Sequence, residues 1–254
     1  MDEIMILPKG KLWVEAAMEL FLGEAIACIA DRGWFSVALS GGSTPKAVYA
    51  ALGAPEKRGE VCWEKVHLFW GDERHVPPDD PKSNFRMVRE ALLDHVPIPD
   101  DNVHRVPAEL DVRKAAWNYE AELRGHFSGD WPSFDLVFLG MGEDGHTASL
   151  FPYSSGLNEE DRWFIENFSS ENEAWRLTLT RHAINAARLI VVLVQGKSKA
   201  EMLKTVLTGP VKPGQFPIQL IRPVDGRMVW LTDDDAAGLL PLDFRDQFPA
   251  SDIR

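Results

Sequence analysis

The chain has 254 residues, of which 45% are hydrophobic and 26% are charged, a composition typical of a soluble globular protein with a sizeable core. Lys and Arg number 27 against 39 Asp and Glu, a formal net charge of −12, which argues against nucleic acid and an anionic membrane surface as partners. A small anionic ligand stays compatible with this charge, because a local cluster of cations can bind one.

No internal repeat or long linker divides the sequence, so we expect a single domain over residues 1–254. The longest aliphatic run, Leu189–Val194, is too short to span a bilayer, and Met1–Ile4 lacks the basic start of a signal peptide. Cys28 and Cys62 stand among apolar neighbours without CxxC spacing, which indicates two reduced core residues. We therefore expect a cytoplasmic protein, with the choice between monomer and homodimer left open.

The predicted elements alternate between helix and strand along the chain. Apolar residues recur at helical spacing near residues 12–31, and Phe35–Leu39 has the composition of a buried strand. Thr44 and Pro45 predict the N-cap and first residue of a helix that runs to about Leu52. Further strands are expected at 66–70, 134–140, 175–179, 189–194 and 227–231, and helices at 85–96, 112–127, 181–187, 199–207 and 233–240. This alternation predicts a three-layer α/β fold with a mainly parallel sheet.

Three predicted strands end in loops rich in glycine or charge, and strand-end loops often carry the chemistry of α/β enzymes. In the first loop, Ser40–Pro45, the glycines Gly41 and Gly42 let backbone N–H groups approach a ligand closely. Ser43 and Thr44 can donate further hydrogen bonds at the start of a helix. These features predict a phosphate cradle, although a tight turn with nothing bound fits the same pattern.

The second loop, Gly71–Val76, places two carboxylates, a guanidinium and an imidazole in four residues. Arg74 is suited to a phosphate or a sugar oxygen, and Asp72 or Glu73 is suited to orienting a histidine from a neighbouring loop. A surface cluster of salt bridges is the alternative interpretation.

The third loop, Gly140–His146, follows an apolar strand and places Asp144 two residues before His146. A histidine in such a loop can take or give a proton near neutral pH, so we expect His146 to be catalytic with Asp144 beside it. The letters of this loop also fit the dinucleotide fingerprint GxGxxG. Because no acidic residue ends a strand about twenty residues later, we do not expect a dinucleotide.

The seven histidines are scattered along the chain, and none forms an HxH or HxxxH pair. The sequence therefore predicts no metal site. Two further cations, Arg176 and Lys199, stand at the ends of predicted elements. Each is weak evidence by itself, because most Lys and Arg side chains are simply solvated.

Taken together, these segments resemble the 6-phosphogluconolactonase family. The resemblance covers nearly the whole chain and rests on five motifs in order, Leu39–Lys46, Phe69–Val76 with Ser83-Asn84, Gly140–Pro152, Arg176–Thr180 and Gly196–Lys199. It implies a Rossmann-like fold shared with glucosamine-6-phosphate deaminases and ribose-5-phosphate isomerases. It also implies hydrolysis of 6-phosphogluconolactone, a phosphorylated sugar lactone of the pentose phosphate pathway, without a metal or organic cofactor.

The resemblance also implies roles for individual residues. It implies that His146 is the catalytic residue and that Arg74 faces the substrate. It also implies that Arg176 and Lys199 contact the phosphate, and that the phosphate loop consists of Gly41, Gly42, Ser43 and Thr44. One departure is the segment Phe168–Trp175, which lacks the proline-rich stretch that the family carries before this strand. This segment is expected to form one wall of the pocket, so the resemblance does not fix the shape of that wall or the role of Arg176.

The resulting hypothesis is that neutral His146 takes a proton from water as the water attacks the lactone carbonyl, and then gives it to the departing ring oxygen. Asp144 or a carboxylate of Asp72-Glu73 would orient the imidazole. An amino-sugar phosphate deaminase on the same fold would need a glutamate just beyond the histidine, and Thr147–Pro152 contains no acid. A non-catalytic sugar-phosphate sensor is the other alternative.

Overall fold

The apolar runs of the sequence become the centre of a parallel sheet in the computed structural model, which describes residues 3–171, 173–241 and 244. The strand with the sequence Leu-Ile-Val-Val-Leu-Val is buried along its whole length, as expected for a parallel strand covered on both faces. The large sheet has the order β1-β10-β9-β6-β2-β3-β5, and its pairings are all parallel. Its strands are β1 (Glu3–Leu7), β2 (Phe35–Leu39), β3 (Val66–Trp70), β5 (Val103–His104), β6 (Leu136–Gly140), β9 (Leu189–Val194) and β10 (Arg227–Asp233).

A second, smaller sheet is antiparallel and has the order β4-β8-β7. Its strands are β4 (Asp72–Arg74), β7 (Phe164–Ser169) and β8 (Ala174–Leu179). β4 follows β3 after a single residue, Gly71, so the small sheet continues directly from the carboxyl end of a central strand. This connection brings β7 and β8 toward the edge of the large sheet where strand-end loops gather.

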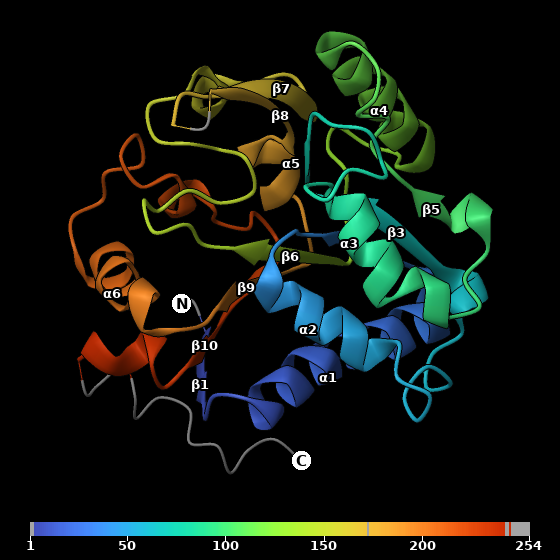
Figure 1. The fold of residues 1–254 in the computed structure, drawn as a ribbon, viewed down its shortest axis with the longest axis horizontal. Helices are drawn as coiled ribbons and strands as arrows, with labels where there is room; N and C mark the ends of the chain where they lie inside the picture. The colour runs from blue at the N-terminus through green and yellow to red at the C-terminus, as the bar shows by residue number, and fades with distance from the viewer. Residues whose placement is uncertain (1–2, 172, 242–243, 245–254) are drawn as a thin grey trace.

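The helices form the outer layers of the fold. In Figure 1, α1, α2 and α3 lie on one side of the large sheet, and α5 and the small sheet lie on the other. The α-helices are α1 (Lys11–Arg32), α2 (Ser43–Leu52), α3 (Asn84–Ala91), α4 (Val112–His126), α5 (Arg181–Asn185) and α6 (Ala200–Thr208). The 3-10 helices are η1 (Trp63–Lys65), η2 (Leu93–His95), η3 (Asp100–Asn102), η4 (Ser155–Asn158), η5 (Lys197–Lys199), η6 (Pro217–Leu220) and η7 (Ala236–Leu239).

From the neighbouring strands β2 and β6 the chain adds further strands in opposite directions across the sheet. From β2 the chain proceeds through α2 to β3 and on to the edge strand β5, whereas from β6 it proceeds to β9 and β10 on the other side. The loops after β2 and β6 therefore diverge and leave a crevice at the carboxyl edge of the sheet. Open α/β sheets bind their ligands at such a switch point.

The structure confirms the α/β fold with its mainly parallel sheet and corrects several expected details. α2 begins at Ser43 after Gly42, so Thr44 is not its N-cap. The closing helix is reduced to the 3-10 turn η7, and the strands β1, β4, β5 and β7 were not predicted. Cys28 is buried as expected, but the expectation for Cys62 was wrong because it is exposed. Within the described part of the chain, no helix has both the length and the apolarity needed to cross a membrane.

Candidate active site

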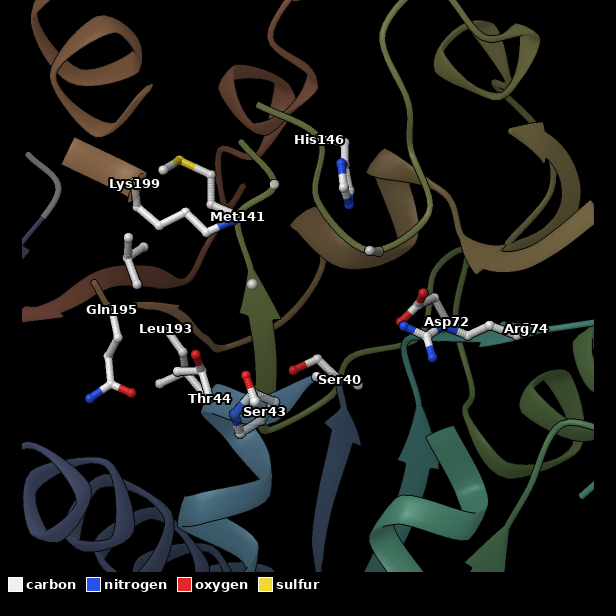
Figure 2. A pocket seen from close by; sticks show the side chains of 17 residues that line it. Ser40, Ser43, Thr44, Asp72, Arg74, Met141, His146, Leu193, Gln195 and Lys199 are labelled. Carbon is white, nitrogen blue, oxygen red and sulfur yellow. The ribbon is translucent and has the colours of Figure 1, made fainter. Parts of the chain in front are cut away.

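A cavity of about 280 Å³ opens at the carboxyl edge of the large sheet, where the loops after β2, β3, β6 and β9 meet (Figure 2). Small-ligand sites commonly have this order of size and this position in α/β sheets. Of the side chains that the sequence singled out, the cavity is lined by Gly41, Gly42, Ser43, Thr44, Asp72, Arg74, His146 and Lys199. The fold thus brings together residues of all three predicted loops and Lys199, which lie between positions 41 and 199 of the chain.

The first loop forms the floor of the cavity at the start of α2. Gly42 has a φ of 108°, a left-handed conformation that favours glycine. Gly41 lies so close to Asn84 that a Cβ atom at this position would overlap the Asn84 carboxamide. The N–H groups at the start of α2 and the hydroxyls of Ser43 and Thr44 therefore border one space, which is a suitable arrangement for an anion.

Two carboxylates of the second loop have structural partners. Glu73 is buried and accepts hydrogen bonds from the backbone N–H groups of Arg74, Asn84 and Phe85 and from the Ser83 hydroxyl. It thereby anchors the start of α3 and does not contact His146. Burial raises the pKa of Glu73, and the backbone hydrogen bonds oppose this rise.

Asp72 lies at the cavity wall, where its Oδ2 accepts a hydrogen bond of 2.7 Å from the Ser149 hydroxyl. Its Oδ1 accepts a longer bond of 3.3 Å from Asn84 Nδ2. These contacts join the second loop to the segment that follows His146. Arg74 lines the same cavity, and its Nη1 donates to the carbonyl oxygen of Lys82 at 2.6 Å.

Asp144 is the carboxylate that orients His146. Its Oδ1 lies 2.5 Å from His146 Nδ1 and also accepts the His146 backbone N–H at 3.1 Å. Burial acts to raise the pKa of Asp144, but the hydrogen bonds and the charge of His146 outweigh it, so the pKa lies below its usual value. With a carboxylate at Nδ1, the neutral ring carries its proton there and leaves Nε2 as an acceptor.

A glycine is needed for this pairing to fit. A Cβ atom at Gly142 would overlap both the imidazole of His146 and the carboxylate of Asp144. The Gly142 N–H instead donates to the His146 carbonyl at 2.8 Å, which closes the loop on itself. In Figure 2 the His146 ring extends from this loop toward the side of the cavity that carries Ser43 and Thr44.

The two cations of the second half of the chain differ in their placement. Lys199 ends η5 and lines the cavity. Arg176 lies in β8 directly opposite Arg74 of β4 and is not among the residues that line the cavity. Burial, followed by the charge of Arg74, lowers the pKa of Arg176. The structure thus places Lys199 at the cavity and Arg176 beside Arg74 on the neighbouring strand.

Some features of this region were missed by the sequence analysis. The cavity is also lined by Ser40, Met141, Ala148 and Gln195. Ser40 and Gln195 each directly follow a predicted strand, and this position was the available signal. The side-chain oxygen of Ser40 is buried and has no hydrogen-bond partner within the described residues. It is thus a candidate contact for a ligand.

Three histidines that the sequence analysis treated as scattered come together in space. Among the described residues, His67, His104 and His126 form a group that could hold a metal ion. None of them lines the cavity described above. A search for HxH or HxxxH spacing could not reveal this group, because 37 and 22 positions separate the three histidines along the chain.

Comparison with known proteins gives the same family as the five motifs. The family model for glucosamine-6-phosphate isomerases/6-phosphogluconolactonase matches residues 8–230. A 6-phosphogluconolactonase of Synechocystis sp. is 42% identical over 92% of this chain and 96% of its own length. The solved structure of 6-phosphogluconolactonase from Trypanosoma brucei aligns with a TM-score of 0.84 at 30% identity, covering 95% of this chain and 99% of the other.

A monomeric glucosamine-6-phosphate deaminase of the NagB superfamily has a TM-score of 0.79 at 18% identity and covers 93% of this chain and 99% of its own. This likeness concerns the fold alone. The match of the family model over most of the chain, together with the relative at 42% identity, decides the classification. The chain belongs to the glucosamine-6-phosphate isomerase/6-phosphogluconolactonase family.

Proposed function

We propose that this protein hydrolyses 6-phospho-D-glucono-1,5-lactone to 6-phosphogluconate. The relatives that it matches over most of its length are named 6-phosphogluconolactonases after this activity. The observation that carries the proposal is that one cavity is lined both by His146, whose ring is paired with Asp144, and by an anion cradle. The substrate needs both, because its phosphate must be bound while its carbonyl is attacked.

The phosphate would bind between the first loop and Lys199. A sugar phosphate carries a charge of about −1.5 to −2 at pH 7, and a protein of net charge −12 repels it at long range. Salt screens this repulsion beyond about 8–10 Å, so local cations decide binding. Lys199, Arg74 and the N–H groups at the start of α2 supply a positive field inside the cavity.

Arg176 would support this field from the neighbouring strand. Arg74 and Arg176 are paired across β4 and β8, and the charge of Arg74 contributes to lowering the pKa of Arg176, a repulsion between like charges that a nearby anion would reduce. A bound phosphate would offset this repulsion. This role is indirect, since Arg74 and not Arg176 lines the cavity.

In the hydrolysis that we propose, Nε2 of neutral His146 accepts a proton from water while the water oxygen forms a bond with the lactone carbonyl carbon. The bond between that carbon and the ring oxygen then breaks, and the imidazolium returns the proton to the departing oxygen. Asp144, which has a lowered pKa and stays ionised, stabilises the imidazolium between these steps. The step needs no group beyond water and these two side chains.

Lactone hydrolysis is favoured over amino-sugar deamination by the residues that follow His146. Thr147–Pro152 contains no acid, and the Ser149 hydroxyl within it is bonded to Asp72. Ring opening of an amino sugar would need a carboxylate at this side of the histidine.

The test is the rate of lactone hydrolysis above the spontaneous rate, measured with 6-phosphogluconolactone and with unphosphorylated gluconolactone. We expect hydrolysis that strongly prefers the phosphorylated substrate and no release of ammonia from glucosamine 6-phosphate. Ammonia release would support the deaminase alternative. Binding of 6-phosphogluconate without lactone turnover would support the sensor.

A further inference from the structure

Three histidines from different elements converge at a site remote from the cavity. His67 is the second residue of β3, His104 is the last residue of the edge strand β5, and His126 is the last residue of α4. One ligand nitrogen from each ring lies within 4.8 Å of the others. The active-site cavity is at the opposite, carboxyl end of β3, so catalysis does not explain this cluster.

The spacing of the nitrogens is close to that of a metal site. His67 Nδ1 lies 3.1 Å from His104 Nε2. Zn–N bonds are about 2.0–2.1 Å long and tetrahedral, which separates two ligand nitrogens by about 3.3 Å. Because all three nitrogens lie within 4.8 Å of one another, bringing the third ring to this separation requires a shift of at most about 1.5 Å.

A carboxylate supports one of the rings from behind. Glu122 Oε1 lies 2.8 Å from His104 Nδ1, which places the ring proton on Nδ1 and makes Nε2 an acceptor. Without a metal this Nε2 accepts a hydrogen bond from His67 Nδ1; a metal would replace that proton, and His67 would carry its own proton on Nε2. Histidine ligands of metals are commonly backed by a carboxylate in this way, because it fixes the tautomer and raises ligand basicity. Aromatic rings of Trp34, Phe69 and Phe127 surround the cluster.

The cluster is accessible and its surroundings attract cations. A surface cavity lined by Asp100, Asp101 and Glu122 also contains His104 and His126. The three carboxylates lie beside the imidazoles, so they favour the approach of a cation.

We propose that His67, His104 and His126 bind one divalent transition-metal ion, for which Zn²⁺ is the probe. Three neutral imidazoles suit zinc and its first-row neighbours, whereas calcium and magnesium prefer oxygen ligands. The bound ion joins the edge strand β5 and the end of α4 to β3. It therefore stabilises this edge of the sheet and leaves the hydrolytic site unaltered.

The experiment is calorimetric titration of the metal-stripped protein with Zn²⁺, followed by thermal unfolding. We expect one equivalent of Zn²⁺ to bind, and at a free Zn²⁺ concentration of 100 times Kd we expect Tm to rise by about 5–10 °C. The variant His126→Gln should lose this binding and the rise in Tm. Glu122→Gln should weaken binding about 10- to 100-fold, the usual effect of losing a carboxylate behind a ligand.

Two matched variants locate the site. His182→Gln removes a histidine that pairs with Glu160 outside the cluster, and it should bind Zn²⁺ as the unmodified protein does. His146→Gln removes the catalytic imidazole and should also retain binding at one equivalent. No saturable binding by the unmodified protein, or unchanged affinity in a folded His126→Gln variant, would overturn the proposal. Loss of binding in His146→Gln would do the same, since it would place the ion in the active site.

Discussion

The hydrogen bond between Asp144 and His146 gives the sharpest prediction about the catalytic mechanism. In Asp144→Asn the side chain keeps its size and an oxygen that can accept the bond, but it loses its charge. Asp144 Oδ1 lies 2.5 Å from the ring and the two side chains are 34% and 33% exposed. The substitution therefore removes a short ionic hydrogen bond from a partly solvated site.

The expected loss follows from the energy of that bond. Hydrogen bonds to a charged group contribute about 1.5–3 kcal/mol against about 0.5–1.5 kcal/mol for neutral ones. The difference of about 1–2 kcal/mol applies mainly to the imidazolium formed during the reaction, and it corresponds to about 5- to 30-fold in rate. A wrong ring tautomer lowers the rate further. We therefore expect kcat to fall about 10- to 100-fold, with KM changing less.

The assay is lactone hydrolysis corrected for the spontaneous rate across pH 5–8. Because the carboxylate that is removed is charged, we expect the loss of activity at every pH in this window. The lowered pKa of Asp144 keeps it ionised throughout this window. The control is Glu143→Gln, which makes the same change of charge at an exposed neighbour. Equal loss in both variants, or none in Asp144→Asn, would refute the orienting role.

Three other substitutions test the cradle, the loop and the support of the site. Lys199→Met should raise KM about 10- to 100-fold, because it removes a charged partner of the phosphate, while kcat changes less. Gly142→Ala should lower kcat about 100-fold in steady-state kinetics, because its methyl group displaces His146 and Asp144. Glu73→Gln should lower the free energy of unfolding in urea by about 1–3 kcal/mol, because an amide cannot accept from all four donors.

Each of these substitutions has a matched control in the chain. Lys197→Met changes an exposed lysine of the same turn, and Gly140→Ala adds a methyl group that meets no atom within 4 Å. Glu90→Gln neutralises an exposed glutamate near the end of α3, where it pairs with Arg86. The reasoning fails if any control matches its partner variant in the measured parameter.

The sequence was sufficient to predict which loops meet at the cavity, because a single structural rule determines their position. Parallel strands place their carboxyl ends at one edge, so the loops containing Gly42, Asp72 and His146 had to meet once each strand was recognised. Apolar runs such as Leu189–Val194 predict these strands, because strands covered on both faces contain little else. The sequence left Asp144, Asp72 and Glu73 as candidates for the carboxylate beside His146, and in the structure Asp144 is the one that contacts the ring.

Contacts between distant segments could not be read from the sequence. The antiparallel pairing of β4 with β8 places Arg176 beside Arg74, and a three-residue strand such as β4 is too short to show a periodicity in the sequence. The start of α2 depends on Gly42, whose left-handed φ replaces a side-chain cap. The convergence of His67 and His104 follows from the pairing of β3 with the two-residue strand β5.

The most direct test of the central claim compares two parameters in one variant, His146→Gln. The claim is that the imidazole acts on the lactone while separate groups of the same cavity hold the phosphate. We expect turnover of 6-phosphogluconolactone to fall about 10²- to 10⁴-fold, while the Kd for 6-phosphogluconate stays within about threefold of the original. Undiminished turnover, or an equal loss of binding and turnover, would contradict the account.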